Sequence, residues 1–236
     1  IAGYTVRLKP QAEQHRIRPL GPWPPPRRAD PGNPVSGQPL AIELGRQLFR
    51  DPRMSPVGYI ACVTCHQPDR AFTDFKPRAH GLADLPHNTP ALANLGLQRR
   101  FGWGGDHDRL WKASQRPILD AREFNGSASS VVQLFVREPA LASCYRSVFG
   151  ESPLADPPRT LQRVAQALAA FVETLRTGRT PFDDFRVALL RGDVRGIAAY
   201  PQPAQRGLQL FVGRAGCVRC HVGANLSDGA QHDALS

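Results

Sequence analysis

The sequence has few aromatic residues, with 3 Trp, 4 Tyr and 11 Phe among 236 residues, and it has a single Met. No run of about 18 apolar residues occurs, so no membrane-spanning helix is predicted. Alternating strand-like patterns are also missing, which predicts an all-α fold with extensive coil. The net charge of +10 can steer acidic partners. Because no Lys/Arg run is interleaved with aromatics, nucleic acid is not an expected partner.

Cysteines are also scarce, and four of the five lie in two C-x-x-C-H motifs, at 62–66 and 217–221. This motif is typical of covalent c-type haem attachment. Two thiols one short turn apart can each bond a vinyl group of one porphyrin, and the adjacent histidine can bind its iron. A zinc site or a redox dithiol is the alternative, but neither requires that histidine. The predicted haem residues are Cys62, Cys65, His66, Cys217, Cys220 and His221.

Periodic apolar residues predict several helices, and two haem motifs so far apart in the sequence favour two haem domains. The domain boundaries that we expect are a Pro-rich lead at 1–37, a first haem domain at 38–155 and a second at 156–236. Leu44-Gly45-Arg46-Gln47-Leu48-Phe49 and Arg206-Gly207-Leu208-Gln209-Leu210-Phe211 form a pseudo-repeat, each before one haem motif. The predicted helices cover 40–49, 110–116, 131–136, 141–149, 157–177, 181–190 and 204–211.

Two single residues and the two ends of the chain give further expectations. The lone Met54 is predicted to be core filler rather than an iron ligand, and Cys144 to be an inert buried thiol. The chain does not begin with Met and shows no signal peptide, so we expect a missing or processed N-terminus. Only residues 222–236 follow His221, which predicts a fragment of a longer haem protein.

The chain resembles the bacterial di-haem cytochrome c peroxidases and their relative MauG, from about Leu44 to Asp233. The likeness rests on segments in the family's order and at compatible spacing. These segments are LGRQLFRDPRMS, CVTCHQPDRAFTD, HNTPALAN, the loop around Trp103, the stretch from Pro117 to Glu123, AQALAAFVETL and RGLQLFVGRAGCVRCHVGANLSDG.

The resemblance implies a periplasmic protein of two cytochrome c-like domains with two covalent haems and one calcium ion. The first haem would react with peroxide and the second would accept electrons from a donor. Trp103 matches the tryptophan between the haems, and Asn88 matches a calcium-binding asparagine. Glu123 matches the distal acid/base glutamate, and His80 matches a displaceable distal haem ligand.

The need for a proton-transfer group can be argued without the family, and Glu123 is the candidate for it. Cleavage of peroxide needs a group that takes a proton from one oxygen and returns it to the other. Without the resemblance, however, Glu123 is an ordinary turn glutamate, His80 an exposed loop histidine and Trp103 a packing aromatic.

The chain also departs from the family at three places. Ala113 stands where the family has a distal glutamine, and Gln115 would point elsewhere on a helix. His87 replaces an arginine, and the loop after Trp103 has the sequence Gly-Gly-Asp. The distal ligand of the second haem would lie beyond Ser236.

Three functions are therefore considered. The first is a peroxidase that reduces hydrogen peroxide to water with electrons from a small donor protein, a cytochrome c or cupredoxin. The second is a MauG-like oxidase that withdraws electrons from a protein partner. The third is a di-haem electron carrier without catalysis, which the alanine at 113 favours. For the oligomeric state of the protein, we consider a homodimer.

Overall fold

The structure is a computed structural model that describes residues 10–26 and 29–230. It divides into two compact units. The larger comprises 28–176, and the smaller combines 1–27 with 177–236. The described part contains helices and coil with only isolated β-bridges, which confirms the predicted all-α fold. None of the described helices has both the length and the apolar character to cross a membrane.

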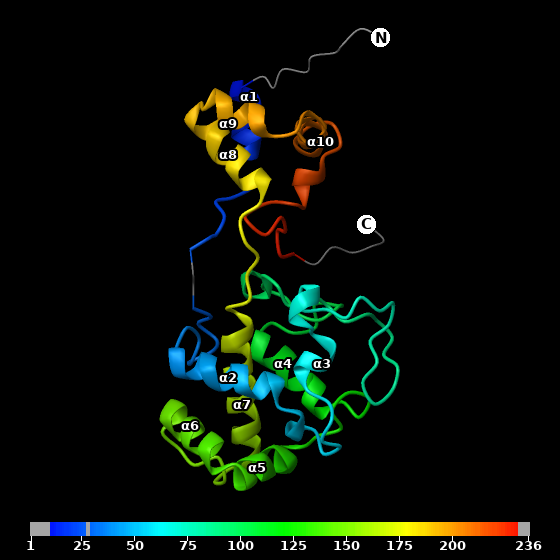
Figure 1. The fold of residues 1–236 in the computed structure, drawn as a ribbon, viewed down its shortest axis with the longest axis vertical. Coiled ribbons are helices and arrows are strands. Elements are labelled where there is room, and N and C mark those ends of the chain that lie inside the picture. Colours follow the sequence, from blue (N-terminus) through cyan, green and yellow to red (C-terminus); the bar gives the residue numbers. More distant parts are fainter. Residues whose placement is uncertain (1–9, 27–28, 231–236) are drawn as a thin grey trace. The chain divides into compact units, whose positions relative to one another are not determined.

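Helix α7, Pro157–Val172, lies at the centre of the larger unit (Figure 1). Eleven of its sixteen residues are buried, so it needs partners on several sides. These partners are α2 (Pro39–Arg50), α4 (Leu110–Leu119) and α5 (Ala128–Arg137), while α6 (Pro139–Phe149) packs against α2 and α5. The core is therefore built around one helix.

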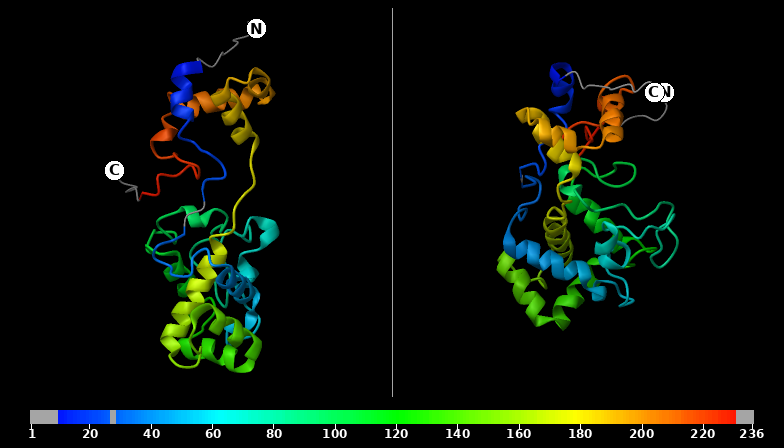
Figure 2. Two further views of the ribbon diagram at one scale, coloured as in Figure 1. Left: turned by 90° about the vertical axis from the view of Figure 1, so that its left-hand side faces the viewer. Right: turned by 45° about the horizontal axis from the view of Figure 1, so that its top comes forward.

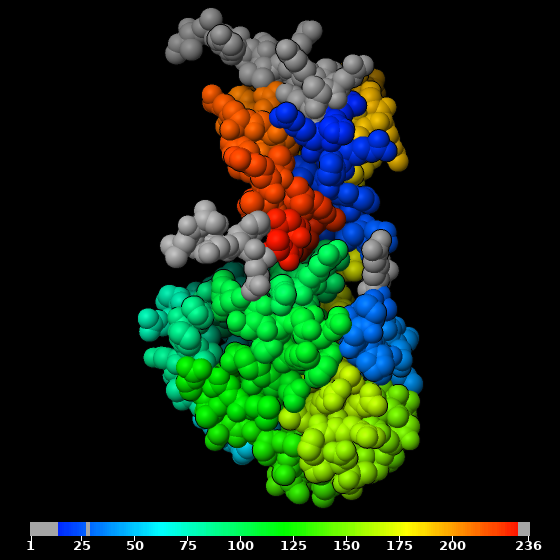
Figure 3. All heavy atoms as spheres, turned by 180° about the vertical axis from the view of Figure 1, so that it is seen from behind, coloured from blue at the N-terminus to red at the C-terminus, as the bar shows by residue number. Residues whose placement is uncertain are grey.

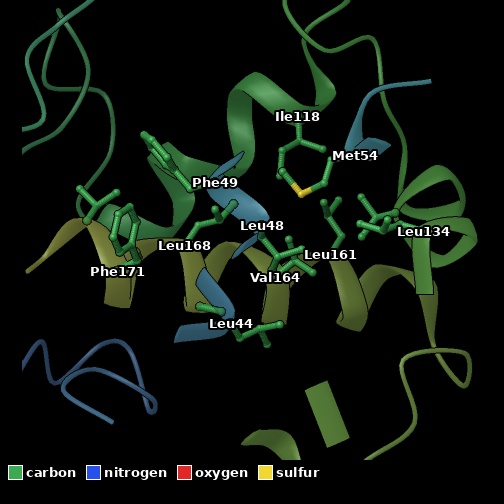
Figure 4. Close-up of a cluster of buried hydrophobic side chains, with 14 of the residues drawn as sticks. Leu44, Leu48, Phe49, Met54, Ile118, Leu134, Leu161, Val164, Leu168 and Phe171 are labelled. Atoms are coloured by element: carbon green, nitrogen blue, oxygen red, sulfur yellow. The ribbon is translucent and has the colours of Figure 1, made fainter. Parts of the chain in front are cut away.

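The core side chains come from segments that are far apart in the sequence (Figure 4). Met54 is fully buried among them, which confirms that it is core filler. Gly45 allows α2 to approach α7 closely, because a Cβ there would lie 2.0 Å from the Ala167 carbonyl oxygen. The labelled residues are Leu44, Leu48, Phe49, Met54, Ile118, Leu134, Leu161, Val164, Leu168 and Phe171.

Long loops separate the short helix α3, Cys62–Cys65, from α4, and they extend on one side of the larger unit (Figure 1 and Figure 2). They contain the short 3₁₀ turns η2 (Pro68–Arg70) and η3 (Leu95–Leu97), while η1 (Pro52–Met54) lies before α3. Residues around α4, green in Figure 3, form much of one face of this unit. The predicted coil therefore surrounds the first haem motif.

The smaller unit gathers α1 (Pro10–Ile17), α8 (Pro181–Arg191), α9 (Val194–Ala199) and α10 (Gln202–Val212), as both views of Figure 2 show. The turn η4, Cys217–Arg219, follows α10. Apolar side chains from α1, α8 and α10 form its core, and Val218 of the second haem motif packs against it. The buried members are Ile17, Leu20, Phe185, Leu189, Leu208 and Val212.

The two units differ from the domain boundaries that we expected, in both the lead and the middle of the chain. Trp23 of the lead is 8% exposed and donates its indole N–H to the Thr177 carbonyl oxygen at 3.2 Å, so this segment is part of the smaller unit. Asn33 instead donates to the Gln166 carbonyl oxygen at 2.9 Å, in the larger unit. Helix α7 also belongs there, because α2, α4 and α5 bury it.

The seven predicted helices are present, with differences in their extent; the one predicted over 157–177 ends at Val172. Helix α4 continues through Pro117 to Leu119, since the proline removes one donor while Ile118 is fully buried in the core. Helices α1, α3 and α9 were not predicted, and α1 lies in the segment that we expected to be a Pro-rich lead. Cys144 is exposed, so the expectation of a buried thiol was wrong. The buried residues of α6 are Leu141, Ala142 and Tyr145, and Cys144 lies at the edge of the face that they form.

Candidate functional site

The first haem motif forms a single helical turn. Cys62 and Cys65 are the first and last residues of α3, and their i,i+3 spacing places both thiols on one side of that turn. The Thr64 hydroxyl accepts a hydrogen bond from the Ala61 N–H at 3.0 Å and fixes the start of the turn. Burial raises the pKa of Cys62 to about 12, so an unmodified thiol there is neutral.

His66 is oriented by the chain that follows it. Its Nδ1 lies 2.9 Å from the Phe72 carbonyl oxygen. A carbonyl oxygen only accepts, so Nδ1 carries the proton and Nε2 keeps its lone pair. Phe72 has a φ of 59°, in the left-handed region that few non-glycine residues adopt. That backbone conformation turns its carbonyl oxygen toward the histidine.

The second motif repeats this arrangement. His221 Nδ1 lies 3.0 Å from the carbonyl oxygen of Leu226, whose φ is 50°. The preceding helix also contributes an aromatic ring in each unit. Phe49 lies 6.4 Å from His66, and Phe211 lies 6.0 Å from His221, between ring centroids. The sequence pseudo-repeat therefore extends to the orientation of both histidines.

Both motifs fit a covalently attached haem. Each offers two thiols one turn apart and a histidine whose Nε2 has the lone pair that iron binds. Burial lowers the pKa of His66, which favours the neutral imidazole that a metal requires. Among the described residues, His, Cys, Asp and Glu side chains form no group of three or more that suits a metal ion.

Glu123 lies on the turn after α4, and its side chain is 18% exposed. Its Oε1 accepts a hydrogen bond of 2.6 Å from an Arg116 guanidinium nitrogen. Burial raises the pKa of Glu123, and the positive charge of Arg116 opposes that rise. The charge of Glu123 also raises the pKa of both Cys62 and Cys65, after the larger effect of burial. The structure therefore brings this carboxylate within electrostatic reach of both thiols of the first motif.

The His80 loop packs against the same turn. Leu82 and Ala83 each donate a backbone N–H to the Arg122 carbonyl oxygen, at 2.7 and 3.1 Å. The His80 carbonyl oxygen lies 3.8 Å from Cys65 Sγ, so this loop passes beside the first motif. The His80 ring is exposed and its Nδ1 lies 2.7 Å from an Asp84 carboxylate oxygen. Its Nε2 faces away from that contact.

Trp103 and Asn88 lie together. The indole N–H of Trp103 donates to the Asn88 carbonyl oxygen at 2.9 Å, and the His87 ring lies 5.9 Å from the indole. Trp103 is 55% exposed, so its ring is not a core residue of the larger unit. The structure thus pairs two residues that the sequence places fifteen positions apart.

Three features of the site could not be predicted from the sequence. The left-handed Phe72 and Leu226 follow no recognisable sequence signal, because neither is glycine. Arg116 is the third, since nothing in its surroundings in the sequence marks it as the partner of Glu123. Ala113 packs against the hydrophobic core and contributes only a methyl group.

Comparison with known proteins assigns the family. The profile of the family described as di-haem cytochrome c peroxidase matches residues 39–193. The methylamine utilization protein MauG of Methylorubrum extorquens is 38% identical over 203 residues, covering 85% of this chain and 54% of the relative. The cytochrome c551 peroxidase of Pseudomonas aeruginosa is 32% identical over 197 residues, covering 83% and 53%. The chain belongs to the di-haem cytochrome c peroxidase family, whose members bind two c-type haems.

Solved structures agree with this assignment. A MauG-like protein associated with microbial copper homeostasis superposes with a TM-score of 0.71 at 27% identity, covering 89% of this chain and 59% of that one. The di-haem peroxidase BthA of Burkholderia thailandensis gives 0.66 at 25% identity, covering 86% and 51%. The chain spans a little over half the length of the relatives that it matches.

Proposed function

We propose that this protein is a di-haem peroxidase that reduces hydrogen peroxide to water with two electrons from a small redox protein. The observation that carries this proposal is Glu123. It is a mostly buried carboxylate, within electrostatic reach of both thiols of the first haem motif. A proton-transfer group of this kind is what the heterolysis of peroxide requires beside the iron.

The residues of the first haem motif and Glu123 would have different roles in this reaction. The haem held by Cys62, Cys65 and His66 supplies the redox chemistry with peroxide when it is bound. His66 would bind iron through Nε2, with the ring fixed by its hydrogen bond to the Phe72 carbonyl oxygen. Glu123 would take the proton from the near oxygen of peroxide and return it to the departing oxygen, which leaves as water.

The remaining roles in the proposal rest on the family likeness. The haem on Cys217, Cys220 and His221 would accept electrons from a cytochrome c or a cupredoxin, and Trp103 would lie between the haems. His80 would be a displaceable distal ligand, for which Nε2 of its exposed ring is suited.

Metal, location and assembly belong to the same proposal. Asn88 would contribute to a calcium site, which a calcium-dependent change in activity after chelation would test. The protein would act in the periplasm, where the family's soluble donors are found, and a homodimer is the proposed assembly. Sedimentation of the holo-protein with and without calcium tests both the assembly and its metal dependence.

A MauG-like oxidase is the second candidate. It is favoured by the 38% identity to a methylamine utilization protein MauG, which exceeds the 32% identity to the Pseudomonas peroxidase. Such an enzyme would draw electrons from a protein partner instead of receiving them from a donor. Peroxide turnover with a reduced cytochrome or cupredoxin as the only electron source supports the peroxidase, and its absence supports the oxidase.

Glu123→Gln tests the proposal most simply, since it keeps the shape of the side chain and removes its proton-accepting charge. We expect the rate of peroxide reaction to fall by about a hundredfold to ten-thousandfold, with the haem absorption spectrum unchanged. Glu138→Gln is the matched control, because Glu138 is also paired with an arginine, Arg53, at the start of α6. Unchanged kinetics in Glu123→Gln would show that this carboxylate has no role in the reaction.

A further inference from the structure

Arg116 makes a two-pronged contact on the turn that contains Glu123. One of its terminal nitrogens lies 2.6 Å from Glu123 Oε1, and the other lies 3.0 Å from Asp120 Oδ2. Each of the two terminal guanidinium nitrogens therefore has its own carboxylate, and the planar group holds the two carboxylates in a fixed relation. Arg116 itself is 51% exposed, while the side chains of Glu123 and Asp120 are 18% and 14% exposed.

The backbone around this contact is closed by hydrogen bonds. The Phe124 N–H donates to the Pro117 carbonyl oxygen at 3.2 Å, and the Gly126 N–H donates to the Ile118 carbonyl oxygen at 2.8 Å. These bonds fold the chain after α4 back onto the last turn of the helix. Arg116, in that last turn, is thereby placed beside a residue seven positions further on. The position of the guanidinium follows from the fold and not from a flexible loop.

Asp120 is held independently. Its Oδ1 accepts the Arg122 backbone N–H at 2.9 Å, and its Oδ2 accepts an Arg122 guanidinium N–H at 3.1 Å. These hydrogen bonds lower the pKa of Asp120, so it is ionised at neutral pH and binds the second terminal nitrogen of Arg116 as a carboxylate. Ala113, one helical turn before Arg116, brings only a methyl group.

We propose that Arg116 is a positioning residue for the peroxide reaction, one that orients the Glu123 carboxylate and stabilises its negative charge. This inference rests on the proposed function of Glu123. The ionised groups that face Glu123 are Arg116, Asp120 and Arg122, besides the two thiols that haem attachment consumes. Arg116 is the cation in hydrogen-bond contact with it, and Arg122 acts through its charge at longer range.

The balance of these groups predicts how a substitution acts. Burial raises the pKa of Glu123, Arg116 opposes the rise, and Asp120 adds to it. Without Arg116 the carboxyl keeps the burial and the negative neighbour, so it holds its proton to a higher pH. A protonated carboxyl cannot take the proton of peroxide. The acid limb of the rate profile therefore moves to higher pH, with a loss of about tenfold in rate for each unit of movement on its acid side.

The experiment compares the holo-protein with Arg116→Gln, Arg116→Lys and the matched control Arg122→Gln, whose side chain is equally exposed and binds the same Asp120. Two quantities are measured against pH. One is the single-turnover rate with hydrogen peroxide. The other is the infrared band of the protonated Glu123 carboxyl, assigned by its loss in Glu123→Gln.

In Arg116→Gln we expect the infrared midpoint and the acid limb to move together to higher pH. In Arg116→Lys the infrared midpoint and the acid limb should move less than in Arg116→Gln. In Arg122→Gln both should stay nearer to their wild-type pH. An infrared midpoint that does not move in Arg116→Gln, or that moves as far in Arg122→Gln, overturns the inference. If instead Glu123→Gln reacts normally with peroxide, the proposed function fails, while the infrared midpoint still decides whether Arg116 controls the carboxyl.

Discussion

Alanine at Gly45 and alanine at Gly207 should have opposite effects on stability, although the two glycines occupy the same position of the pseudo-repeat. In α2, a Cβ on Gly45 would lie 2.0 Å from the Ala167 carbonyl oxygen and 2.9 Å from Phe171 Cβ. Both atoms belong to the central helix α7 and cannot move aside as a flexible side chain could. A Cβ on Gly207 in α10 meets no atom within 4 Å.

The magnitudes follow from packing and helix propensity. Overpacking of a filled core costs about 1–3 kcal/mol, and this contact is with backbone, so we expect the upper part of that range for Gly45→Ala. The gain in helix propensity, about 0.8–1.0 kcal/mol, offsets only part of it. Gly207→Ala keeps the propensity gain alone and should raise the free energy of unfolding of its unit by about 0.5–1 kcal/mol.

Urea unfolding of both holo-protein variants, followed by circular dichroism, measures these differences. Gly45→Ala should unfold at lower urea than the wild type, and Gly207→Ala at equal or higher urea. A Gly45→Ala protein as stable as the wild type would refute the close packing of α2 on α7. Equal destabilisation by both substitutions would refute the different surroundings of the two glycines.

Two further predictions concern a thiol and a buried carboxylate. With the other four cysteines bonded to haem, a thiol reagent should label one cysteine per native chain, the exposed Cys144, and Cys144→Ser should remove that labelling; two or more labelled thiols would mean incomplete haem attachment. Burial raises the pKa of Glu173 above its ordinary value of 4.5. Its Oε1 is buried without a hydrogen-bond partner, while its Oε2 accepts a hydrogen bond from the Ser36 hydroxyl. Ionisation of this buried carboxyl therefore lowers the free energy of unfolding. Glu173→Gln should therefore stabilise the protein by about 1 kcal/mol at pH 7 and by nothing at pH 4 or below in urea titrations, and a difference that is independent of pH would contradict this.

The helices and the haem motifs could be predicted because their signals are local. Apolar residues at helical spacing mark α2, α7 and α10, and the C-x-x-C-H spacing alone indicates the attached cofactor. Cys144 lies at the edge of the face of α6 that Leu141, Ala142 and Tyr145 form, so helical periodicity alone does not decide whether its thiol is buried. Apolar neighbours along the sequence do not fix the burial of a residue at such an edge, so the burial expected for Cys144 was wrong.

The rest depends on contacts between distant segments. The Pro-rich composition of the lead indicates extended chain, yet Trp23 is buried by a hydrogen bond and packing with residues that follow α7. No local pattern marks that partner. The orientation of His66 depends on a left-handed phenylalanine, and the partner of Glu123 depends on how the chain folds back after Pro117. Backbone propensity disfavours a left-handed phenylalanine, and it gives no information on how the chain folds back after Pro117.

The reaction of the fully reduced holo-protein with hydrogen peroxide, followed by stopped-flow absorption, tests the central claim most directly. Two haems supply two electrons, which reduce one peroxide to two waters. We expect rapid loss of the reduced haem bands with one peroxide consumed per chain, and recovery of those bands when a reduced donor protein is added. Reduced bands that persist in excess peroxide would contradict peroxidase activity and leave the protein as an electron carrier.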